Sequence, residues 1–469
     1  MVLIDLLQPR HNYAPQEGLG HIYLPTSLLT AGARLLHAGV KVKFHDENLA
    51  PADLSSRYVG VNLIGSAYIP EMIKLQGRIV QEIGEDPTFL LGGRVVDGLT
   101  PSQFDQLFGD SYNGNNDEVL TRILGINPAV LPSPEKTSLI PAYQKLDDKV
   151  MKKYLEQEIS LYVSQGCKFS CNFCAAVRTV KDPFTGKVTK IKESYRDPSI
   201  IHDELDYLVS RAEKLDLHKL QIYLSNLDLF QTPSELLKFA QAVKEVKNNH
   251  HGFDIQMRAL STVDSFLEAR DSRKSLLSGK KVVEEMIEAG LEKIGFGIDG
   301  MTPAVWNAIK KGHNSQDACI EAIRSSREDF GLTPETLMVF GHEGIDTEET
   351  LALAYQFTLD MVDRFGAIPR PHVAKAFIPG NDGWNNQRYA TQIQALLDHP
   401  ESFQSLDFTA LPSLITHPNP ALRDVTTGYF MQICDIPSNK TLYVKPITPE
   451  LTPEEADEVK RFNQGRYDL

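Results

Sequence analysis

Residues 159–174 read ISLYVSQGCKFSCNFC, a short strand-like run followed at once by three cysteines. Cys167, Cys171 and Cys174 follow the spacing C-x3-C-x2-C, although the whole chain has only 5 cysteines among 469 residues. The run before them predicts a β-strand because it is short, largely apolar and rich in strand-forming residues. We therefore expect a loop of three thiols just past the carboxyl end of a strand, where α/β folds keep their chemistry.

Strand and helix patterns alternate along the chain from residue 159 onward. The strand candidates are ISLYVSQ, LQIYLSN, FDIQMRA, LEKIGFGI, TLMVFGH and HVAKAFI, with helix-like segments between them. These six units are too few to close an eight-stranded barrel. Residues 159–385 are therefore predicted to form an open, partial (β/α)6 barrel of the TIM type, followed by a small C-terminal extension at 386–469.

The same alternation fills residues 1–125. The strand candidates there are VLIDLL, VKVKFHD, YVGVNLIG and TFLLGG. Alternating strands and helices predict a parallel sheet covered on both faces, so we expect a doubly wound, Rossmann-like domain in an α/β protein. Residues 126–158 are rich in proline and turn formers and are predicted to be a linker.

Composition and charge argue against some classes of binding partner. The chain has 48 Lys and Arg against 62 Asp and Glu, a net charge of −14, which argues against a nucleic-acid partner. No apolar run approaches the length of a membrane helix, and the first residues lack the basic flank of a signal peptide. Few, irregularly spaced cysteines argue against a disulfide framework, so we expect a cytoplasmic protein with no membrane partner.

The cysteine cluster has several alternative interpretations. A disulfide would leave one thiol over, and a reducing compartment disfavours it. A structural zinc site needs four ligands, and no second C-x2-C or histidine pair stands nearby. Buried structural cysteines would not need this spacing, or Lys168 among them. A [4Fe–4S] cluster is usually held by four thiolates, so three would leave one iron open, as at a catalytic site. The iron–sulfur reading fits best.

The cysteine spacing, with Phe173 directly before the last cysteine, resembles the motif of the radical S-adenosylmethionine (SAM) enzymes. The resemblance implies that Cys167, Cys171 and Cys174 hold a [4Fe–4S] cluster and that Phe173 lies at the cofactor. In that family the amino and carboxylate groups of SAM chelate the open iron. An electron from the cluster then cleaves SAM to methionine and a 5′-deoxyadenosyl radical.

Further segments extend this resemblance over residues 159–385. SNLDLF is similar to the family segment that holds the SAM amino group, which implies Asn226 as the contact. Arg258, at the end of FDIQMR, stands where many members place a basic partner for the SAM carboxylate. MIEAGLEKIGFGIDG resembles a segment in which Asp299 replaces the usual glutamate. FIPGNDGW, residues 377–384, resembles the loop that closes the last strand.

Residues 1–125 resemble the cobalamin-binding domain that precedes the radical SAM core in one large branch. GLGHIYLPTSLLTAGARLLHAGVKVKFHDENL is similar to its opening strand, helix and strand. Ser66 begins a segment like the family's S-x-L, and Gly92 and Gly93 stand where the nucleotide tail of the corrinoid usually rests against bare backbone. The resemblance implies cobalamin between this domain and the barrel mouth, near these three residues.

One motif of that branch is missing. In D-x-H-x-x-G the histidine binds cobalt from below, but His11 has Pro9 in the place of the aspartate. Counting back from Gly20 gives Glu17 in the place of the histidine. His11 is therefore interpreted as an ordinary loop residue. Cobalamin without a protein ligand below the cobalt, and a domain that has lost the cofactor, both stay open.

The leading hypothesis is cobalamin-dependent methyl transfer to an unactivated carbon or phosphorus of a small-molecule or peptide substrate. An external electron donor such as flavodoxin or ferredoxin would serve it. The alternatives are a SAM-initiated rearrangement or oxidation, with or without a corrinoid, and a non-catalytic protein that binds a corrinoid or cluster. Cys319 is expected in the core, because it lies on an apolar helix face. Cys434 is interpreted as a buried thiol, with a place near the site left open.

Overall fold

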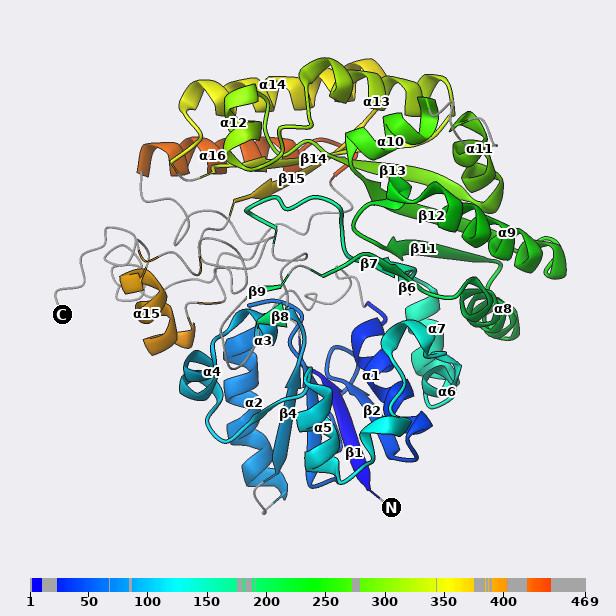
Figure 1. Ribbon diagram of the computed structural model, residues 1–469, viewed down its shortest axis with the longest axis vertical. Helices are drawn as coiled ribbons and strands as arrows, with labels where there is room; N and C mark the ends of the chain where they lie inside the picture. Colours follow the sequence, from blue (N-terminus) through cyan, green and yellow to red (C-terminus); the bar gives the residue numbers. More distant parts are fainter. Residues whose placement is uncertain are drawn as a thin grey trace. The chain divides into compact units, whose positions relative to one another are not determined.

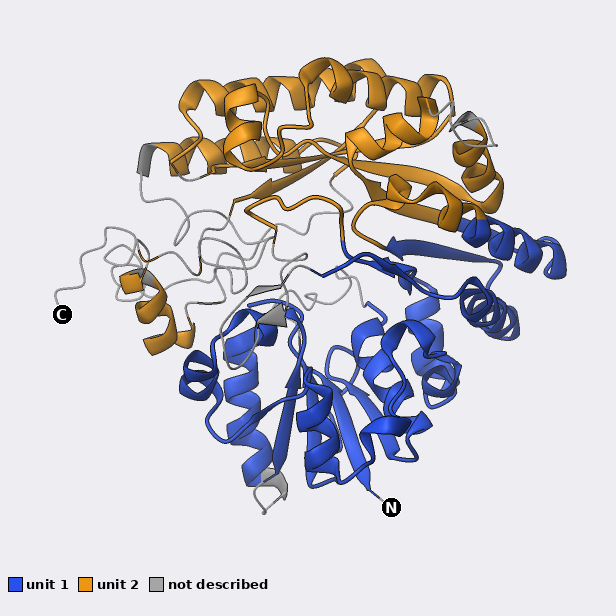
Figure 2. Ribbon diagram, viewed as in Figure 1, with its two compact units in different colours: residues 1–166, 178–225, 238–256 blue, residues 167–177, 226–237, 257–469 orange. Residues whose placement is uncertain are grey.

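The structure is a computed structural model whose elements are drawn in Figure 1. It describes residues 2–10, 23–66, 68–83, 87–174, 180–181, 188–189, 191–271, 279–342, 344–374, 384, 387, 390–401, 403 and 420–439. His11, Glu17, Gly20 and most of FIPGNDGW lie outside these residues. Two compact units are distinguished in Figure 2: unit 1 is residues 1–166, 178–225 and 238–256, and unit 2 is residues 167–177, 226–237 and 257–469.

The first sheet belongs to unit 1 and is parallel. Among the described residues its strand order is β2-β1-β3-β4-β5, with parallel pairing throughout. The strands are β1 (Leu3–Gln8), β2 (Lys41–Asp46), β3 (Tyr58–Asn62), β4 (Thr88–Gly92) and β5 (Tyr112–Asn113). The helices are α1 (Thr26–His37), α2 (Tyr68–Ile83), α3 (Arg94–Gly98), α4 (Pro101–Phe108) and α5 (Asp117–Leu124). The expected strand–helix alternation and parallel sheet are confirmed.

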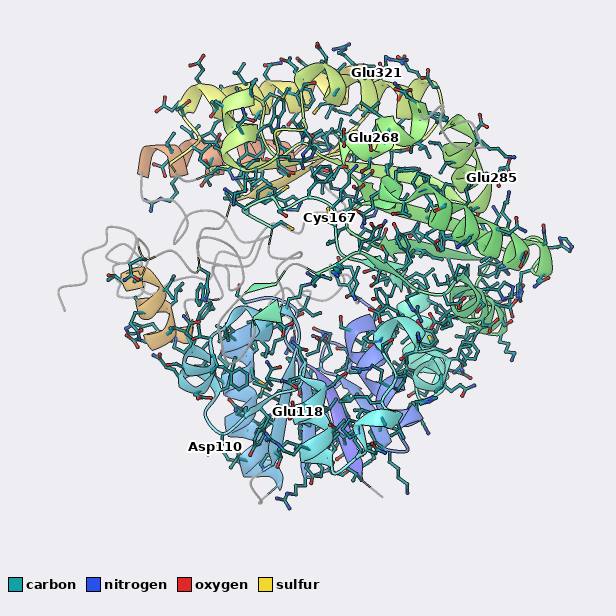
Figure 3. All side chains as sticks on the ribbon, in the orientation of Figure 1. Asp110, Glu118, Cys167, Glu268, Glu285 and Glu321 are labelled. Carbon is teal, nitrogen blue, oxygen red and sulfur yellow. The ribbon has the colours of Figure 1, made fainter. Side chains whose placement is uncertain are left out.

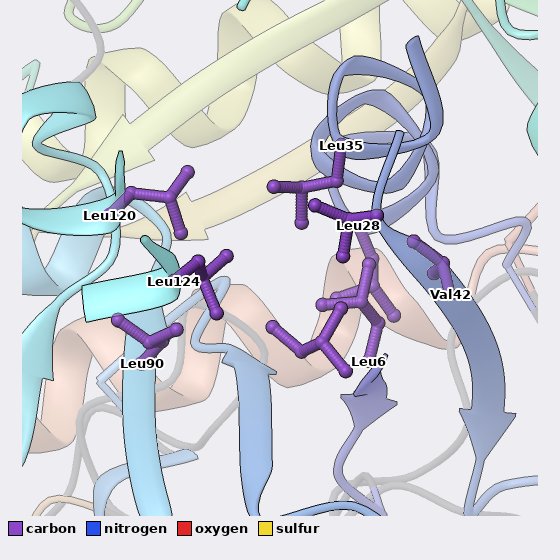
Figure 4. Packing of buried hydrophobic residues seen from close by; sticks show 9 residues of the cluster. Leu6, Leu28, Leu35, Val42, Leu90, Leu120 and Leu124 are labelled. Atoms are coloured by element: carbon purple, nitrogen blue, oxygen red, sulfur yellow. The ribbon is translucent and has the colours of Figure 1, made fainter. Parts of the chain in front are cut away.

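A leucine-rich core joins this sheet to two of its helices. Leu6, Val42 and Leu90 on the strands pack with side chains of α1 and α5 (Figure 4), which are Leu28, Leu35, Leu120 and Leu124. The helical residues recur at intervals of four and seven, so they fall on one side of each helix. Each such side chain contributes about 1.5–3 kcal/mol when it leaves water. Burial of this stripe therefore fixes α1 and α5 on the sheet.

The expected linker is structured. It contains two 3-10 turns, η1 (Pro128–Val130) and η2 (Pro134–Lys136), and two short helices, α6 (Ile140–Tyr143) and α7 (Asp148–Leu155). A fully buried ion pair between Arg196 and Glu204 fastens it. Arg196 donates to the carbonyl of Thr137 at 2.7 Å, and Glu204 accepts from the backbone of Leu139 at 2.6 Å. Removing either charge would leave the other buried and unpaired, which is costly.

The second sheet follows residue 158. Within the described chain it has six strands in the order β15-β14-β13-β12-β11-β6, and its recorded registers are parallel. The strands are β6 (Glu158–Tyr162), β11 (Lys219–Ser225), β12 (Asp254–Ser261), β13 (Leu291–Gly297), β14 (Thr333–Phe340) and β15 (Ile368–Val373). The order is open, with β6 and β15 at its ends. This agrees with the open six-unit barrel expected from the sequence.

Helices and short turns connect these strands. They are α8 (Pro198–Lys214), η4 (Leu229–Gln231), α9 (Pro233–Asn249), α10 (Val263–Asp271), α11 (Gly279–Ala289), α12 (Pro303–Ala308), α13 (Gln316–Glu328) and α14 (Glu348–Phe365). Two-residue strands also occur, namely β7 (Ser164–Gln165), β8 (Val180–Lys181), β9 (Val188–Thr189) and β10 (Ser194–Tyr195). Cys319 on α13 is 0% exposed, which confirms it as a core residue.

The last strand starts earlier than its apolar pattern indicated. β15 covers Ile368–Val373 and contains Pro369 and Pro371, whereas HVAKAFI spans 372–378. Proline lacks an amide proton and is tolerated on an edge strand, which is where β15 lies in the sheet order. Because proline is rare in strands, the two prolines gave no sign in the sequence that the strand begins at Ile368.

Two helices are described in the C-terminal extension, α15 (Ala390–Asp398) and α16 (Pro420–Cys434). α16 packs against β15 and α14. Tyr429 stacks on Tyr355 of α14 with ring centroids 4.4 Å apart, and the Tyr355 hydroxyl is 2.7 Å from the side-chain oxygen of Gln432. Burial raises the pKa of Cys434 to about 12. In the described part of the chain, no helix has both the length and the apolar character needed to cross a bilayer.

Candidate functional site

The cysteine loop begins at a position that favours glycine. Gly166 has φ +84°, and a Cβ there would lie 2.6 Å from the carbonyl oxygen of Lys192 and 2.7 Å from Cα of Glu193. The strand before it, β7, pairs antiparallel with β10. The left-handed turn at Gly166 leads directly into Cys167, which is labelled in Figure 3. A bulkier residue would have to displace backbone to make this turn.

Polar contacts hold the loop from one side. The backbone N–H of Lys168 donates to the side-chain oxygen of Gln231 at 3.0 Å. The Lys168 ammonium lies 3.0 Å from Glu268 and 3.3 Å from Asp264, both on α10. Figure 3 labels Glu268 on that helix. A lysine within the cysteine cluster therefore has an anchoring role in the structure.

Ring contacts and hydrogen bonds from Asn172 hold the other side of the cysteine loop. Phe169 stacks on His313 with centroids 3.8 Å apart, and Phe173 lies 5.5 Å from the His342 ring. Asn172 donates from its side chain to the carbonyl of Ala308 at 3.0 Å, and its backbone N–H donates to Ile309. Burial, together with the charge of Lys311, lowers the pKa of His313 to about 4, so its ring is neutral at pH 7.

The three thiols form no disulfide and are partly buried. Burial raises the pKa of Cys167 to about 11, and nearby negative charge on Asp228 and the other two cysteines adds to the rise. Burial also raises the pKa of Cys171, while the positive charge of Lys311 opposes the rise. The metal-free thiols of Cys167 and Cys171 are therefore protonated at neutral pH, and metal binding there would release protons.

This donor set fits an iron–sulfur cluster. Across the described ranges, no three His, Cys, Asp or Glu side chains are grouped so as to hold one metal ion. A cube of four irons is larger than one ion, and its thiolate ligands need not converge on a single point. Thiols that share one loop and influence one another's pKa suit such a cube. Three of them leave one iron without a protein ligand.

A buried ion pair lies beside Cys171. Lys311 pairs with Asp299, and their side chains are only 5% and 9% exposed. Asp299 has φ +58° just after β13, and its carbonyl oxygen is 3.0 Å from Nε2 of His342. Although burial disfavours its charge, Lys311 has a raised pKa, because Asp299 and Cys171 stabilise the ammonium. Both members act on the pKa of Cys171, which the Lys311 ammonium lowers and the Asp299 carboxylate raises.

A second buried carboxylate follows β11. Asp228 is 0% exposed. It accepts hydrogen bonds from the hydroxyls of Ser261, Thr262 and Ser265 at 3.0, 3.0 and 2.6 Å, and from the backbone N–H of Thr262 at 3.0 Å. Burial raises the pKa of Asp228, and these hydrogen bonds oppose the rise. Asn226 is buried two residues earlier, and its role toward SAM stays a prediction.

Arg258 has a partner within the sheet. Its Nη1 lies 3.2 Å from Glu335 of β14, which is completely buried and also pairs with Arg370 at 2.6 Å. The cation whose charge acts on Cys171 is Lys311, which sequence reasoning missed. Lys311 directly follows Lys310 in the sequence, and no motif gave a reason to single it out. The expected roles of Arg258 at the SAM carboxylate, and of Phe173 and Asp299 at the cofactor, stay predictions.

The glycine pair of unit 1 has a structural explanation of its own. Gly93 has φ +105°, and a Cβ there would lie 2.2 Å from the carbonyl oxygen of Leu63. Asn115 accepts from the Gly93 N–H at 2.9 Å and donates to its carbonyl at 2.8 Å. A Cβ at Gly92 would meet the Asn115 side chain at 3.1 Å. Ser66 is buried just before α2. The roles of these residues toward a corrinoid stay predictions.

Comparison with known proteins gives one family match and one curated relative, and each covers part of the chain. Residues 161–354 match the model of the radical SAM superfamily. An uncharacterised methyltransferase of Pyrococcus horikoshii is 26% identical over 239 residues, which cover 50% of this chain and 44% of that protein. The match therefore spans less than half of that relative.

Solved structures with the same fold cover more of the chain. One is TsrM from Kitasatospora setae, a radical SAM methyltransferase with cobalamin and a [4Fe–4S] cluster bound: the TM-score is 0.57 at 13% identity, over 81% of this chain and 77% of TsrM. Another is OxsB, a cobalamin-dependent SAM radical enzyme: the TM-score is 0.58 at 12% identity, over 87% and 56% of the two chains. At such identities the likeness concerns the fold. The match to the radical SAM superfamily model covers the part of the chain that contains the cysteine loop.

Proposed function

We propose that the protein is a cobalamin-dependent radical SAM methyltransferase that acts on an unactivated carbon or phosphorus of a small-molecule or peptide substrate. The observation that carries the proposal is the loop of three cysteines outside any disulfide, which offers one ligand fewer than a [4Fe–4S] cluster usually has. The fold shared with TsrM and OxsB supports the cobalamin part. The methyltransferase name of the Pyrococcus relative supports the reaction class.

Cys167, Cys171 and Cys174 would hold the cluster. When bound, the cluster supplies the electron that cleaves SAM to methionine and a 5′-deoxyadenosyl radical. The chain's own residues keep the loop in place, since Lys168 and Asn172 tie it to α10 and to the end of α12. The Lys311 ammonium would offset the negative charge that the thiolates gain on binding metal. Phe173, Asn226, Arg258 and Asp299 are proposed to contact SAM.

Cobalamin is proposed to bind unit 1 where β3 and β4 end, near Ser66, Gly92 and Gly93. Ligands of doubly wound folds bind at the carboxyl ends of the strands, and these residues follow β3 and end β4. When bound as methylcobalamin, the cofactor supplies the methyl group. An external donor such as flavodoxin or ferredoxin would deliver electrons.

Product analysis tests the proposal. The full chain is reconstituted anaerobically with iron and sulfide and given SAM, dithionite and hydroxocobalamin. We expect S-adenosylhomocysteine and 5′-deoxyadenosine, measured by mass spectrometry, and neither from a variant with all three loop cysteines changed to alanine. 5′-Deoxyadenosine alone would favour a rearrangement or oxidation. Neither product from a chain with a full cluster would indicate a non-catalytic protein.

A further inference from the structure

Asp228, just after β11, is a buried carboxylate that has no part in the proposed function. The backbone N–H of Thr262 donates to one of its oxygens at 3.0 Å, and the hydroxyls of Thr262 and Ser265 lie 3.0 and 2.6 Å from the other. The Ser265 backbone N–H donates to the Thr262 hydroxyl oxygen, so the proton of that hydroxyl is available to Asp228. Donors on both oxygens suit an ionised carboxylate, which only accepts hydrogen bonds.

The carboxylate joins two segments of unit 2 that lie apart in the sequence. Asp228 directly precedes η4, whereas Thr262 directly precedes α10 and Ser265 lies in the first turn of that helix. Phe230 of η4 packs edge-on against Phe266 of α10, with ring centroids 5.5 Å apart. The hydrogen bonds of Asp228 and this ring contact together fix η4 against the start of α10.

Both segments hold the start of the cysteine loop through Lys168. Its backbone N–H, in the peptide that follows Cys167, donates to the side-chain oxygen of Gln231 on η4 at 3.0 Å. Its ammonium lies 3.0 Å from Glu268 on α10. Asp228 therefore has a fixed position relative to the first cysteine of the loop. In agreement, burial raises the pKa of the Cys167 thiol, and the negative charge of Asp228 adds to the rise.

We propose that the buried charge of Asp228 lowers the reduction potential of the [4Fe–4S] cluster that the cysteine loop would hold. Reduction by the external donor adds one electron, and therefore one negative charge, with no bond made or broken. A fixed negative charge that water does not screen disfavours this gain, so the reduced cluster becomes a stronger reductant. This inference rests on the cluster assignment of the proposed function, and it is independent of cobalamin and of methyl transfer.

Asp228 differs from the other charged groups around the loop. Asp299 and Lys311 form an ion pair, so their charges oppose each other. Glu268 is paired with Lys168, and its side chain is 67% exposed to screening by water. The hydrogen-bond donors that contact Asp228 are three hydroxyls and a backbone N–H, which are neutral groups. Its charge is therefore the one we expect to act on the cluster with the least compensation.

A redox titration of the anaerobically reconstituted full chain tests the inference. The reduced cluster is measured by electron paramagnetic resonance at a series of poised potentials, without SAM. Asp228→Asn removes the charge at nearly constant volume, and we expect a more positive midpoint potential. The expected size is about a tenfold change in the ratio of oxidised to reduced cluster, or about 59 mV for one electron. A unit charge has this effect at up to about 12 Å when the effective dielectric constant is about 20.

Two control variants separate the charge from the structural contacts. Ser265→Ala removes the shortest hydrogen bond to Asp228 but keeps the carboxylate. Glu268→Gln removes an exposed carboxylate that anchors Lys168. We expect both to keep the wild-type midpoint potential. An unchanged potential in Asp228→Asn, or an equal shift in Ser265→Ala, would overturn the inference, because a structural role alone predicts the same effect from both changes at this contact.

Asp228→Ser is a second variant without the charge, and its hydroxyl still offers an acceptor to the Thr262 N–H. It should shift the midpoint potential in the same direction. Loss of the cluster from both Asp228 variants, measured as iron content, would show a purely structural role and refute the inference. The proposed function fails differently, because it is judged by S-adenosylhomocysteine and 5′-deoxyadenosine. A wild-type chain with a cluster but without these products would refute that function and leave the titration decisive.

Discussion

Replacing Lys311 by methionine is expected to destabilise unit 2 strongly. The lysine and its partner Asp299 have side chains only 5% and 9% exposed. Lys311→Met leaves the carboxylate buried without its counter-charge, and breaking a buried pair in this way costs about 3–5 kcal/mol. Replacing both members by uncharged residues of similar volume is often close to neutral. The double variant Asp299→Asn/Lys311→Met should therefore recover most of the loss, a coupling of about 2 kcal/mol or more.

Urea unfolding of the metal-free full chain measures this coupling without interference from the cluster. The chain has 2 tryptophans, and one of them reports on this segment. Trp306 donates from its indole to the carbonyl of Ile298 at 2.9 Å and accepts from the Lys311 backbone at 2.6 Å. Its fluorescence should therefore follow unfolding around the pair. A loss below about 1 kcal/mol in Lys311→Met, or a double variant as unstable as the single one, would refute this reasoning.

Three further outcomes are expected. Changing the three loop cysteines to alanine should abolish the charge-transfer absorbance of the anaerobically reconstituted chain, and a full cluster in that variant would contradict the ligand assignment. Gly166→Ala should lower the free energy of unfolding by about 1–2 kcal/mol or more, because its φ is +84° and backbone lies 2.6 Å from the new Cβ. Gly428→Ala, with open space around its Cβ, is the control. An equal loss in both variants would contradict the role of the left-handed turn at Gly166. Burial raises the pKa of Asp97 from 3.8 to about 6, so ionisation costs stability as pH rises from 4 to 6. Asp97→Asn should therefore raise the unfolding midpoint at pH 7.5, with the gain fading below pH 4, and a pH-independent gain would contradict this.

The sequence by itself determined the features that depend on local patterns. Alternating strands and helices indicated parallel sheets, because such segments cannot pair as hairpins and need helical crossovers. The spacing of the three cysteines fixed a loop with three thiols after a strand, since eight residues of chain keep them close whatever surrounds them. Cys319 was placed in the core for the same kind of reason, as periodicity along one helix decides which side is buried.

Only the tertiary structure decided the partners that lie far apart in the sequence. Asp299 and Lys311 form an ion pair, and Asp299 has a positive φ. Asp228 accepts from the hydroxyls of Ser261 at the end of β12, of Thr262 after it and of Ser265 on α10. Residue types alone do not reveal these contacts. Arg258 was visible in the sequence as a basic residue, but its engagement with Glu335 depends on the register of three strands, β12, β13 and β14. The electrostatics of a site depend on which charged groups pair and how deeply they are buried. Both are decided when distant strands come together. A short stretch of sequence therefore does not predict them.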